Sequence, residues 1–244
     1  MARRQALETK VWLQGQVLRS ERETEPDDGG VRLKICVAEA TIHPRAVRDQ
    51  ATALAYPERV LPPGGAEEYC KAREEGVRTF VLWADRYRQR VHARVVTKSA
   101  VKGKAATYEV LGPAGEPLAL IVRERALTGG LRTRWSVQPT GGPAAIGHKG
   151  NLFWWCVWWL LLPLQALLFV GIALNGGGGE LGHTPRRTKW YFDGVGEDVL
   201  DWSSDCHLTV ADDRWDPRVT AALVLLLESY GGPFDGSWDD GLKD

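Results

Sequence analysis

The sequence predicts a mainly β fold, an antiparallel barrel or sandwich of short strands, interrupted by an apolar membrane segment and completed by a buried C-terminal helix. Three observations support this fold class. Apolar and polar residues alternate with period two over most of the chain, which is typical of half-buried strands. A run of 23 residues, 152–174, carries no charge, and residues 219–227 contain a single polar side chain.

Composition places the chain among ordinary globular proteins. Its 244 residues carry 31 basic and 31 acidic side chains, and 44% of them are hydrophobic. These values exclude a disordered, collagenous or multi-span membrane chain. The charge is unevenly distributed, because residues 175–244 hold 6 basic and 14 acidic side chains whereas residues 1–174 hold 25 and 17. The four cysteines are widely spaced, which is typical of free thiols in a reducing compartment.

Strands are predicted wherever the alternation is regular. It is clearest in residues 31–37, 131–137 and 206–210, each of which has one apolar and one wet face. Residues 112–115, GPAG, predict a hairpin turn. Short strands at a spacing of about 8–12 residues indicate an antiparallel barrel or sandwich. Further strands are expected at residues 11–18, 80–83, 91–97, 107–111, 117–123, 189–192 and 199–202.

Two regions are predicted to be helical. Residues 44–76 read as short surface helices interrupted by prolines. In the second, residues 217–230, Asp216 is placed as N-cap and Pro217 in the first turn. This second helix is apolar around most of its circumference and too short to span a bilayer. We therefore expect protein to enclose it, as a barrel that needs a plug would.

The apolar run 152–174 is predicted to insert into a membrane. As a helix it would be about 34 Å long, which matches a hydrocarbon core of about 30 Å. Tryptophans favour the membrane–water interface, and four of them gather at the N-terminal end of the run. A buried hydrophobic hairpin in a soluble fold is the alternative. The predicted anchor residues are Trp154, Trp155, Trp158, Trp159 and Pro163.

The sequence leaves the path of this run open. Pro163 is compatible with a kinked single span or with a re-entrant hairpin that has about ten residues on each side. The flanking basic residues do not decide, because three precede the run and three follow it. If strands from both sides pair in one barrel, both flanks lie on the same side of the membrane. Otherwise, two small domains flank one span.

Residues 108–119, YEVLGPAGEPLA, are similar to the hairpin "YeV.d..G.pla" of a known family. The strand TRWSV at 133–137 and the DPR at 216–218 that leads into the apolar 221–227 add to this likeness. Over residues 77–232 the sequence resembles the tubby C-terminal-like superfamily, which includes the LURP-one-related proteins and the phospholipid scramblases. The resemblance implies a barrel closed around a C-terminal helix and an affinity for lipid headgroups, although no lipid-binding motif of the family aligns position by position.

The resemblance divides the chain into three parts. Residues 1–76 form an N-terminal β/α segment outside the family pattern, and residues 77–232 form the tubby-like barrel with the membrane segment 152–174. Residues 233–244 are acidic and rich in turn-forming residues, which predicts a flexible tail.

No arrangement of residues predicts catalysis. The sequence contains no phosphate-binding glycine motif, and its histidines lack metal-ligand spacing. Cys206 and His207 are adjacent in a predicted strand and therefore point to opposite faces. We expect no enzyme activity, no cofactor, no metal and no nucleic-acid partner.

The predicted function is that of a membrane-anchored, non-enzymatic binding module, which recognises lipid headgroups or a partner protein at the bilayer. Its soluble parts are expected in the cytoplasm, and its lipids are expected to be anionic. A scramblase-like lipid-handling protein is the alternative, and two small domains of unknown function around a single span are a further one. The candidate headgroup-binding residues are Lys149, Arg186, Arg187 and Lys189.

Overall fold

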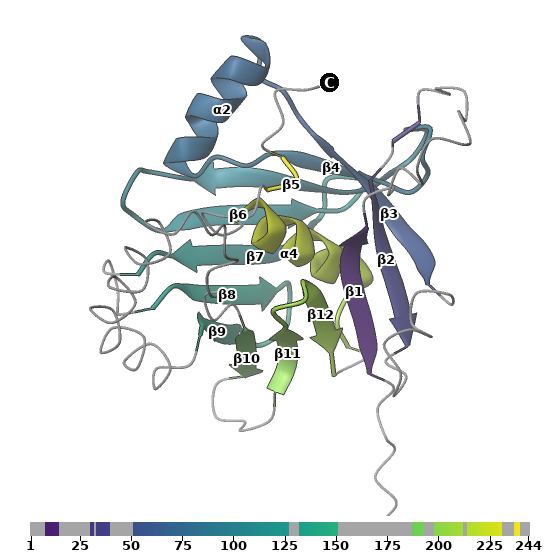
Figure 1. Cartoon of the computed structure of the whole chain (residues 1–244), viewed down its shortest axis with the longest axis vertical. Coiled ribbons are helices and arrows are strands. Elements are labelled where there is room, and N and C mark those ends of the chain that lie inside the picture. The colour runs from purple at the N-terminus through teal and green to yellow at the C-terminus, as the bar shows by residue number, and fades with distance from the viewer. Residues whose placement is uncertain are drawn as a thin grey trace, which may run out of the picture.

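The computed structural model describes residues 8–14, 30–31, 33–39, 51–126, 132–150, 187–192, 198–211, 214–230 and 237–239. Within these residues, twelve strands form a closed antiparallel barrel around a C-terminal helix (Figure 1). Two helices are described. α2 (Gly65–Glu75) connects β3 to β4, and α4 (Pro217–Ser229) follows β12.

The strands follow one another around the barrel in chain order, and β1 pairs with β12 to close the ring. The predicted barrel or sandwich is therefore a barrel. The strands are β1 (Thr9–Gln14), β2 (Lys34–Glu39), β3 (Thr52–Arg59), β4 (Phe80–Trp83), β5 (Val91–Ser99), β6 (Ala106–Leu111), β7 (Pro117–Glu124), β8 (Arg134–Pro139), β9 (Ala145–Lys149), β10 (Thr188–Phe192), β11 (Asp198–Trp202) and β12 (His207–Val210).

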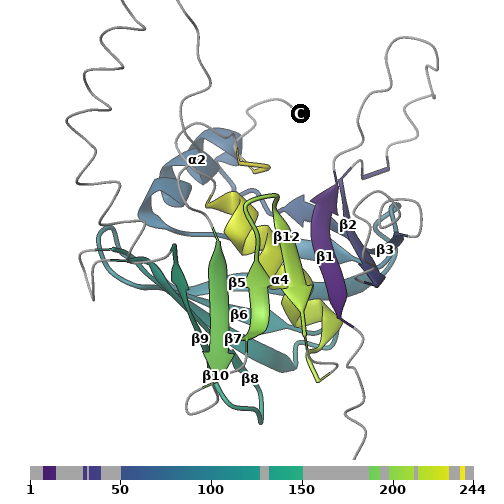
Figure 2. The ribbon, with the colours of Figure 1, turned by 60° about the horizontal axis from the view of Figure 1, so that its bottom comes forward.

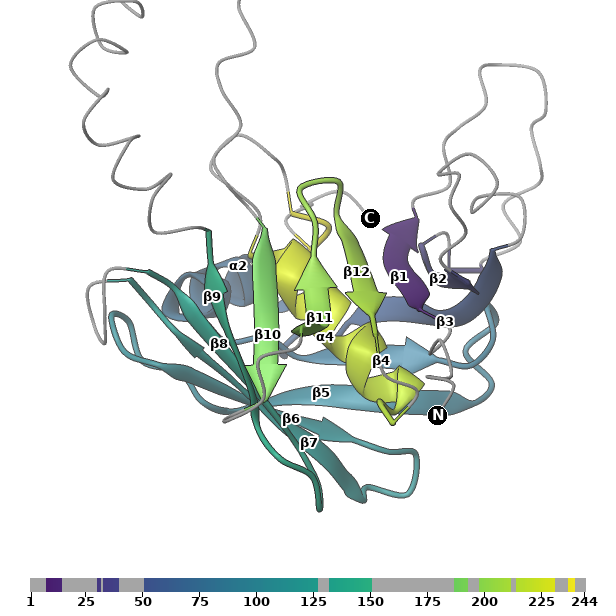
Figure 3. The ribbon, with the colours of Figure 1, turned by 90° about the horizontal axis from the view of Figure 1, so that it is seen from below.

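The core consists of the inward faces of the strands and the whole circumference of α4. Alternate residues of β6 are buried, as period two requires. Every residue of α4 from Val219 to Leu226 is buried, and the helix contacts β1, β3, β5, β7 and β12. Figures 2 and 3 show the helix running through the middle of the barrel. The prediction that protein encloses this helix is confirmed.

The ends of α4 are close to those predicted. The side chain of Asp216 accepts a hydrogen bond from the backbone N–H of Arg218 (2.8 Å), and Pro217 occupies the first turn. The hydroxyl of Thr220 donates to the carbonyl of Pro217 (3.0 Å), so the one polar side chain of the apolar stretch is satisfied inside the barrel.

Part of the predicted helical region 44–76 is a strand. Residues 65–75 are helical as expected, but β3 pairs with β2 and β4 despite containing Pro57. The pairing of β3 with β2 ends at Ala55, so the missing N–H of Pro57 costs no bond to β2. Three strands from the region before residue 77 are thus members of the same barrel.

The two sides of the apolar run 152–174 belong to one barrel. Lys149 of β9 lies opposite Thr188 of β10, and the N–H of Gly150 donates to the carbonyl of Arg187 (2.8 Å). Two separate domains flanking the run do not fit this pairing. The run itself, with the predicted anchor residues Trp154 to Pro163, lies outside the described residues. Among the residues that are described, no helix has the length and apolar character needed to cross a membrane.

Gly147 of β9 is a point of close packing next to the apolar run. A Cβ atom at this position would lie 2.7–2.8 Å from ring atoms of Trp190, a fully buried residue of β10. Only glycine at position 147 therefore lets β9 pair with β10 while the indole of Trp190 lies against the backbone of Gly147.

We predict that Gly147→Ala lowers the free energy of unfolding by about 1–3 kcal/mol, because the added methyl group forces the indole of Trp190 to move within a packed core. Urea denaturation of the detergent-solubilised protein measures the change. Gly142→Ala is the matched control, since its Cβ would meet Pro139 at an ordinary 3.4 Å. Equal losses in the two variants would contradict the packing argument.

Candidate functional site

The candidate site lies at one end of the barrel, which we call the α2 end. β3 ends here and α2 leads from it into β4. Because neighbouring strands are antiparallel, β5, β7, β9 and β11 also end here, and β6, β8, β10 and β12 begin here. The described residues on either side of the apolar run, Gly150 and Arg187, therefore both lie at this end, and the C-terminal end of α4 faces it (Figure 2).

Three of the four predicted headgroup-binding residues are described, and the structure brings them together on β9 and β10. Lys149 ends β9, and Arg187 and Lys189 lie at the start of β10. Arg186 lies outside the described residues. Basic residues that lie on either side of the apolar run in the sequence are therefore neighbours on two paired strands.

Two of these bases already have acidic partners. The guanidinium of Arg187 donates to both oxygens of Asp201, with Nε–Oδ1 at 3.0 Å and Nη2–Oδ2 at 2.5 Å. Lys189 pairs with Asp198. These hydrogen bonds raise the pKa of both basic groups. Arg187 is still 62% exposed at its side chain, so it can contact solvent or a ligand from its paired position.

Further basic residues lie at the neighbouring strand ends and turns of the α2 end. Lys102 and Lys104 lie in the exposed turn between β5 and β6, and within the described part of the chain neither makes an ion pair. Arg132 donates to the carbonyl of Gly150 (2.8 Å) at the base of the apolar run. We call the following residues the basic rim: Lys102, Lys104, Arg125, Arg132, Arg134, Lys149 and Arg187.

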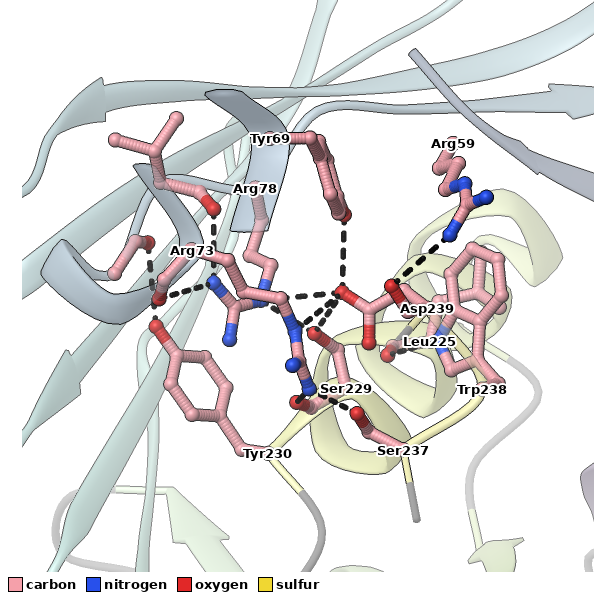
Figure 4. Close-up of polar contacts among 12 residues, drawn as sticks. Arg59, Tyr69, Arg73, Arg78, Leu225, Ser229, Tyr230, Ser237, Trp238 and Asp239 are labelled. Atoms are coloured by element: carbon pink, nitrogen blue, oxygen red, sulfur yellow. Dashed lines mark hydrogen bonds and ion pairs between the residues drawn. The ribbon is translucent and has the colours of Figure 1, made fainter. Parts of the chain in front are cut away.

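A buried polar cluster fills the α2 end beside α4 (Figure 4). Its centre is the carboxylate of Asp239, which is 0% exposed. One oxygen, Oδ2, accepts hydrogen bonds from the hydroxyl of Tyr69 (3.0 Å), the hydroxyl of Ser229 (2.8 Å) and Nε of Arg73 (3.1 Å). Nε of Arg78 forms an ion pair with the same oxygen at 3.5 Å. We call these five residues the tail cluster.

Local structure places each partner. Tyr69 and Arg73 are four residues apart on α2 and so share one face of that helix. Gly76 ends α2 with a φ of 105°, a left-handed conformation that favours glycine, and the chain then turns to bring Arg78 into the cluster. Ser229 is the last residue of α4.

The neighbouring residue, Trp238, anchors the same segment. Its indole N–H donates to the carbonyl of Leu225 in α4 (3.1 Å), and its ring lies 4.8 Å from that of Phe80, centroid to centroid. Residues 237–239 thus differ from the flexible tail that the sequence predicts for 233–244. The acidic, glycine-rich composition concealed a tryptophan–aspartate pair whose partners lie far away in the chain.

The hydrogen bonding of Asp239 is one-sided. Its second oxygen, Oδ1, is buried and has no hydrogen-bond partner among the residues that the structure describes. An unsatisfied buried acceptor costs about 1–3 kcal/mol. Burial and the adjacent negative charge of Asp239 raise the pKa of Tyr69 above its ordinary value.

A second group of aromatic and basic side chains adjoins the cluster. The guanidinium carbons of Arg78 and Arg123 lie 4.5 Å and 3.9 Å from the ring centroid of Tyr230. The hydroxyl of Tyr108 donates to the carbonyl of Gly76 (2.7 Å) and accepts a hydrogen bond from the hydroxyl of Tyr230. Burial lowers the pKa of Arg123. Cation–π contacts of this kind are attractive and hold the two guanidinium groups against the ring of Tyr230.

The described residues contain no group of three or more His, Cys, Asp or Glu side chains that could hold a metal ion. In comparisons with protein-family models, with curated proteins and with solved structures, no match to this chain was found. The arrangement at the α2 end is therefore interpreted from its own chemistry: basic side chains around the base of an apolar segment, and a buried carboxylate site.

We predict that Asp239→Ala lowers the free energy of unfolding by about 3 kcal/mol, because Arg73 and the almost fully buried Arg78 lose their common counter-charge. Urea denaturation in detergent tests this. The control is Glu67→Ala, which breaks an ion pair with Lys71 whose side chains are 74% and 79% exposed and should change stability by less than about 1 kcal/mol. If both variants match the wild type, the tail cluster does not stabilise the fold.

Proposed function

We propose that this protein is a membrane-anchored, non-enzymatic binding module whose barrel is held with its α2 end toward the headgroups of a cytoplasmic leaflet. The observation that carries the proposal is the pairing of Lys149 with Thr188, together with the bond between Gly150 and Arg187. These contacts bring the two described flanks of the 23-residue apolar run, Gly150 and Arg187, together at one end of the barrel, where the basic rim also lies.

The basic rim supports contact with anionic lipids. A lysine or arginine close to an anionic leaflet contributes about 1 kcal/mol of attraction. Lys102 and Lys104 suit this role because they are exposed and their charge is not neutralised by an ion pair within the described residues. Lys149 and Arg187 stand at the base of the apolar run, where headgroups would meet the protein first.

The closed barrel favours a re-entrant path for the apolar run over a single span. After a single span, only residues 175–186 would be available for the return, and these include four glycines, Glu180 and Arg186. Such a segment would carry unsatisfied backbone groups through the hydrocarbon. Two arms of about ten residues that meet at Pro163 would each be about 15 Å long as helices, roughly half of a 30 Å hydrocarbon core.

The closed barrel around a C-terminal helix is consistent with the tubby-like fold that the hairpin at 108–119 resembles. Membership of that superfamily belongs to the proposal. It supports headgroup recognition as the role of the module, and scramblase-like lipid handling is the alternative that the same resemblance raises.

We predict that the wild-type protein, added from detergent to a mixture of anionic and neutral vesicles, associates with the anionic ones by a preference of about tenfold or more. Lys102→Glu/Lys104→Glu should weaken the preference severalfold, because it reverses the charge of two of the four exposed residues of the basic rim. Arg88→Glu/Arg90→Glu makes the same charge change at the opposite end of the barrel and should keep it. Flotation of the separately dyed vesicles measures the distribution.

Replacing Trp154, Trp155, Trp158 and Trp159 by serine should leave most of the protein unbound, since the interfacial anchors are lost. A wild-type protein that stays at the bottom of the gradient would refute membrane anchoring. A protein that floats equally with both kinds of vesicle would keep the anchor and refute headgroup selectivity.

The re-entrant path predicts that β7 and β10 face the same side of the membrane. Single cysteines at the exposed positions Leu120 and Tyr191, in a background without the four native cysteines, should both react with a membrane-impermeant maleimide on sealed vesicles, or both be protected. A marker cysteine fused to a known lumenal segment provides the control. Labelling of only one of the two positions would rule out the re-entrant path.

A further inference from the structure

The tail cluster has the properties of a binding site that is already occupied. The groups that surround Asp239 all come from elements other than the tail, namely α2, the residues before β4, and α4. Arg78 is held independently of the tail, because its Nη1 donates to the carbonyls of Arg73 (2.7 Å) and Val77 (2.8 Å). The site is therefore largely pre-formed, which lowers the cost of binding a ligand.

The chemistry of the site specifies an anionic peptide. Arg73 and Arg78 direct two guanidinium groups at one carboxylate oxygen, and Arg78 is 3% exposed. Without a carboxylate these buried charges would be uncompensated. Arg59 adds a donor to the backbone carbonyl of Asp239 (3.4 Å), so the site also contacts the main chain of its occupant.

The same site selects the residue before the aspartate. The ring of Trp238 packs against Phe80, and its N–H reaches the carbonyl of Leu225. A tryptophan satisfies both contacts, because it combines a large apolar ring with a hydrogen-bond donor. A tryptophan followed by an aspartate is thus the recognised pair.

The fit of the chain's own segment is incomplete. Oδ1 of Asp239 is buried without a partner among the described residues. Covalent attachment adds to these contacts in holding the tail at the site, since only residues 230–236 separate it from α4 and the effective concentration is high. A peptide that satisfies both carboxylate oxygens can therefore displace it.

We propose that the tail cluster is a docking site for a partner protein that presents an aromatic residue followed directly by an aspartate, and that Trp238–Asp239 occupies it as a competing internal ligand. This inference rests on the proposal that the barrel is a binding module and names the chemistry of its partner. It does not require a membrane, so peptide binding and vesicle flotation can fail separately.

The experiment uses fluorescence polarisation of a labelled peptide with the sequence of residues 233–244, added to the full-length protein in detergent. Trp238→Ala/Asp239→Asn in the protein disables the internal ligand and should tighten peptide binding about tenfold or more relative to wild type. The peptide in which the aspartate equivalent to Asp239 is asparagine should bind neither protein. Adding Arg73→Gln to the disabled protein should weaken binding about tenfold or more.

Lys71→Gln, on the exposed face of α2, is the matched control for Arg73→Gln and should leave peptide binding unchanged. If the disabled protein loses its near-UV circular dichroism, the wild type supplies the test, because it should bind the peptide weakly but saturably and reject the asparagine peptide. Absence of saturable binding to a folded disabled protein, or to the wild type where that variant is unfolded, would overturn the proposal. Equal binding of the aspartate and asparagine peptides would do the same.

Discussion

The enclosure of α4 is the constraint on which the rest of this structure depends. Residues 219–226 are buried on every side, and neither water nor a single sheet face could accommodate such a helix. A closed sheet can, and closure requires the first strand to meet the last, as it does where Thr9 lies opposite Val210. Any additional segment must then be an insertion between neighbouring strands. The run 152–174 is placed in this way between β9 and β10, and both of its flanks share one end of the barrel.

Closure also places the two unevenly charged parts of the sequence in one fold. The basic part before residue 175 and the acidic part after it are pieces of one barrel, and several of their charges pair across it. Arg73 and Arg78 meet Asp239, and Arg218 meets Glu116. The net charge of zero therefore belongs to the fold. It does not report two domains on opposite sides of a membrane.

How well the sequence predicts each feature depends on how far apart in the chain the interacting residues lie. The strands and α4 follow local rules, period two and the Asp216-Pro217 start, so the sequence indicates them well. β3 escaped prediction because Pro57 interrupts its local pattern, whereas pairing with β2 and β4 decides its structure. The tail cluster could not be anticipated, because Arg73 and Asp239 are separated by 166 residues. The enclosure of α4 brings them together, because Ser229 at the end of this helix contacts both residues. Its carbonyl accepts from Arg73, and its hydroxyl donates to Asp239.

The end of α4 also separates two kinds of basic residue. The last carbonyl groups of a helix lack partners within it and carry partial negative charge. Here the indole of Trp238 donates to the carbonyl of Leu225, and Nη2 of Arg73 donates to that of Ser229 (3.3 Å). Arg73 thus completes the helix, and Arg73 and Arg78 together hold the tail, so with the tail in place they do not contribute to the outer basic rim. Lys102 and Lys104 have no such structural partner among the described residues. The basic side chains inside the α2 end therefore stabilise the fold, and those of the basic rim are the ones placed to contact a membrane.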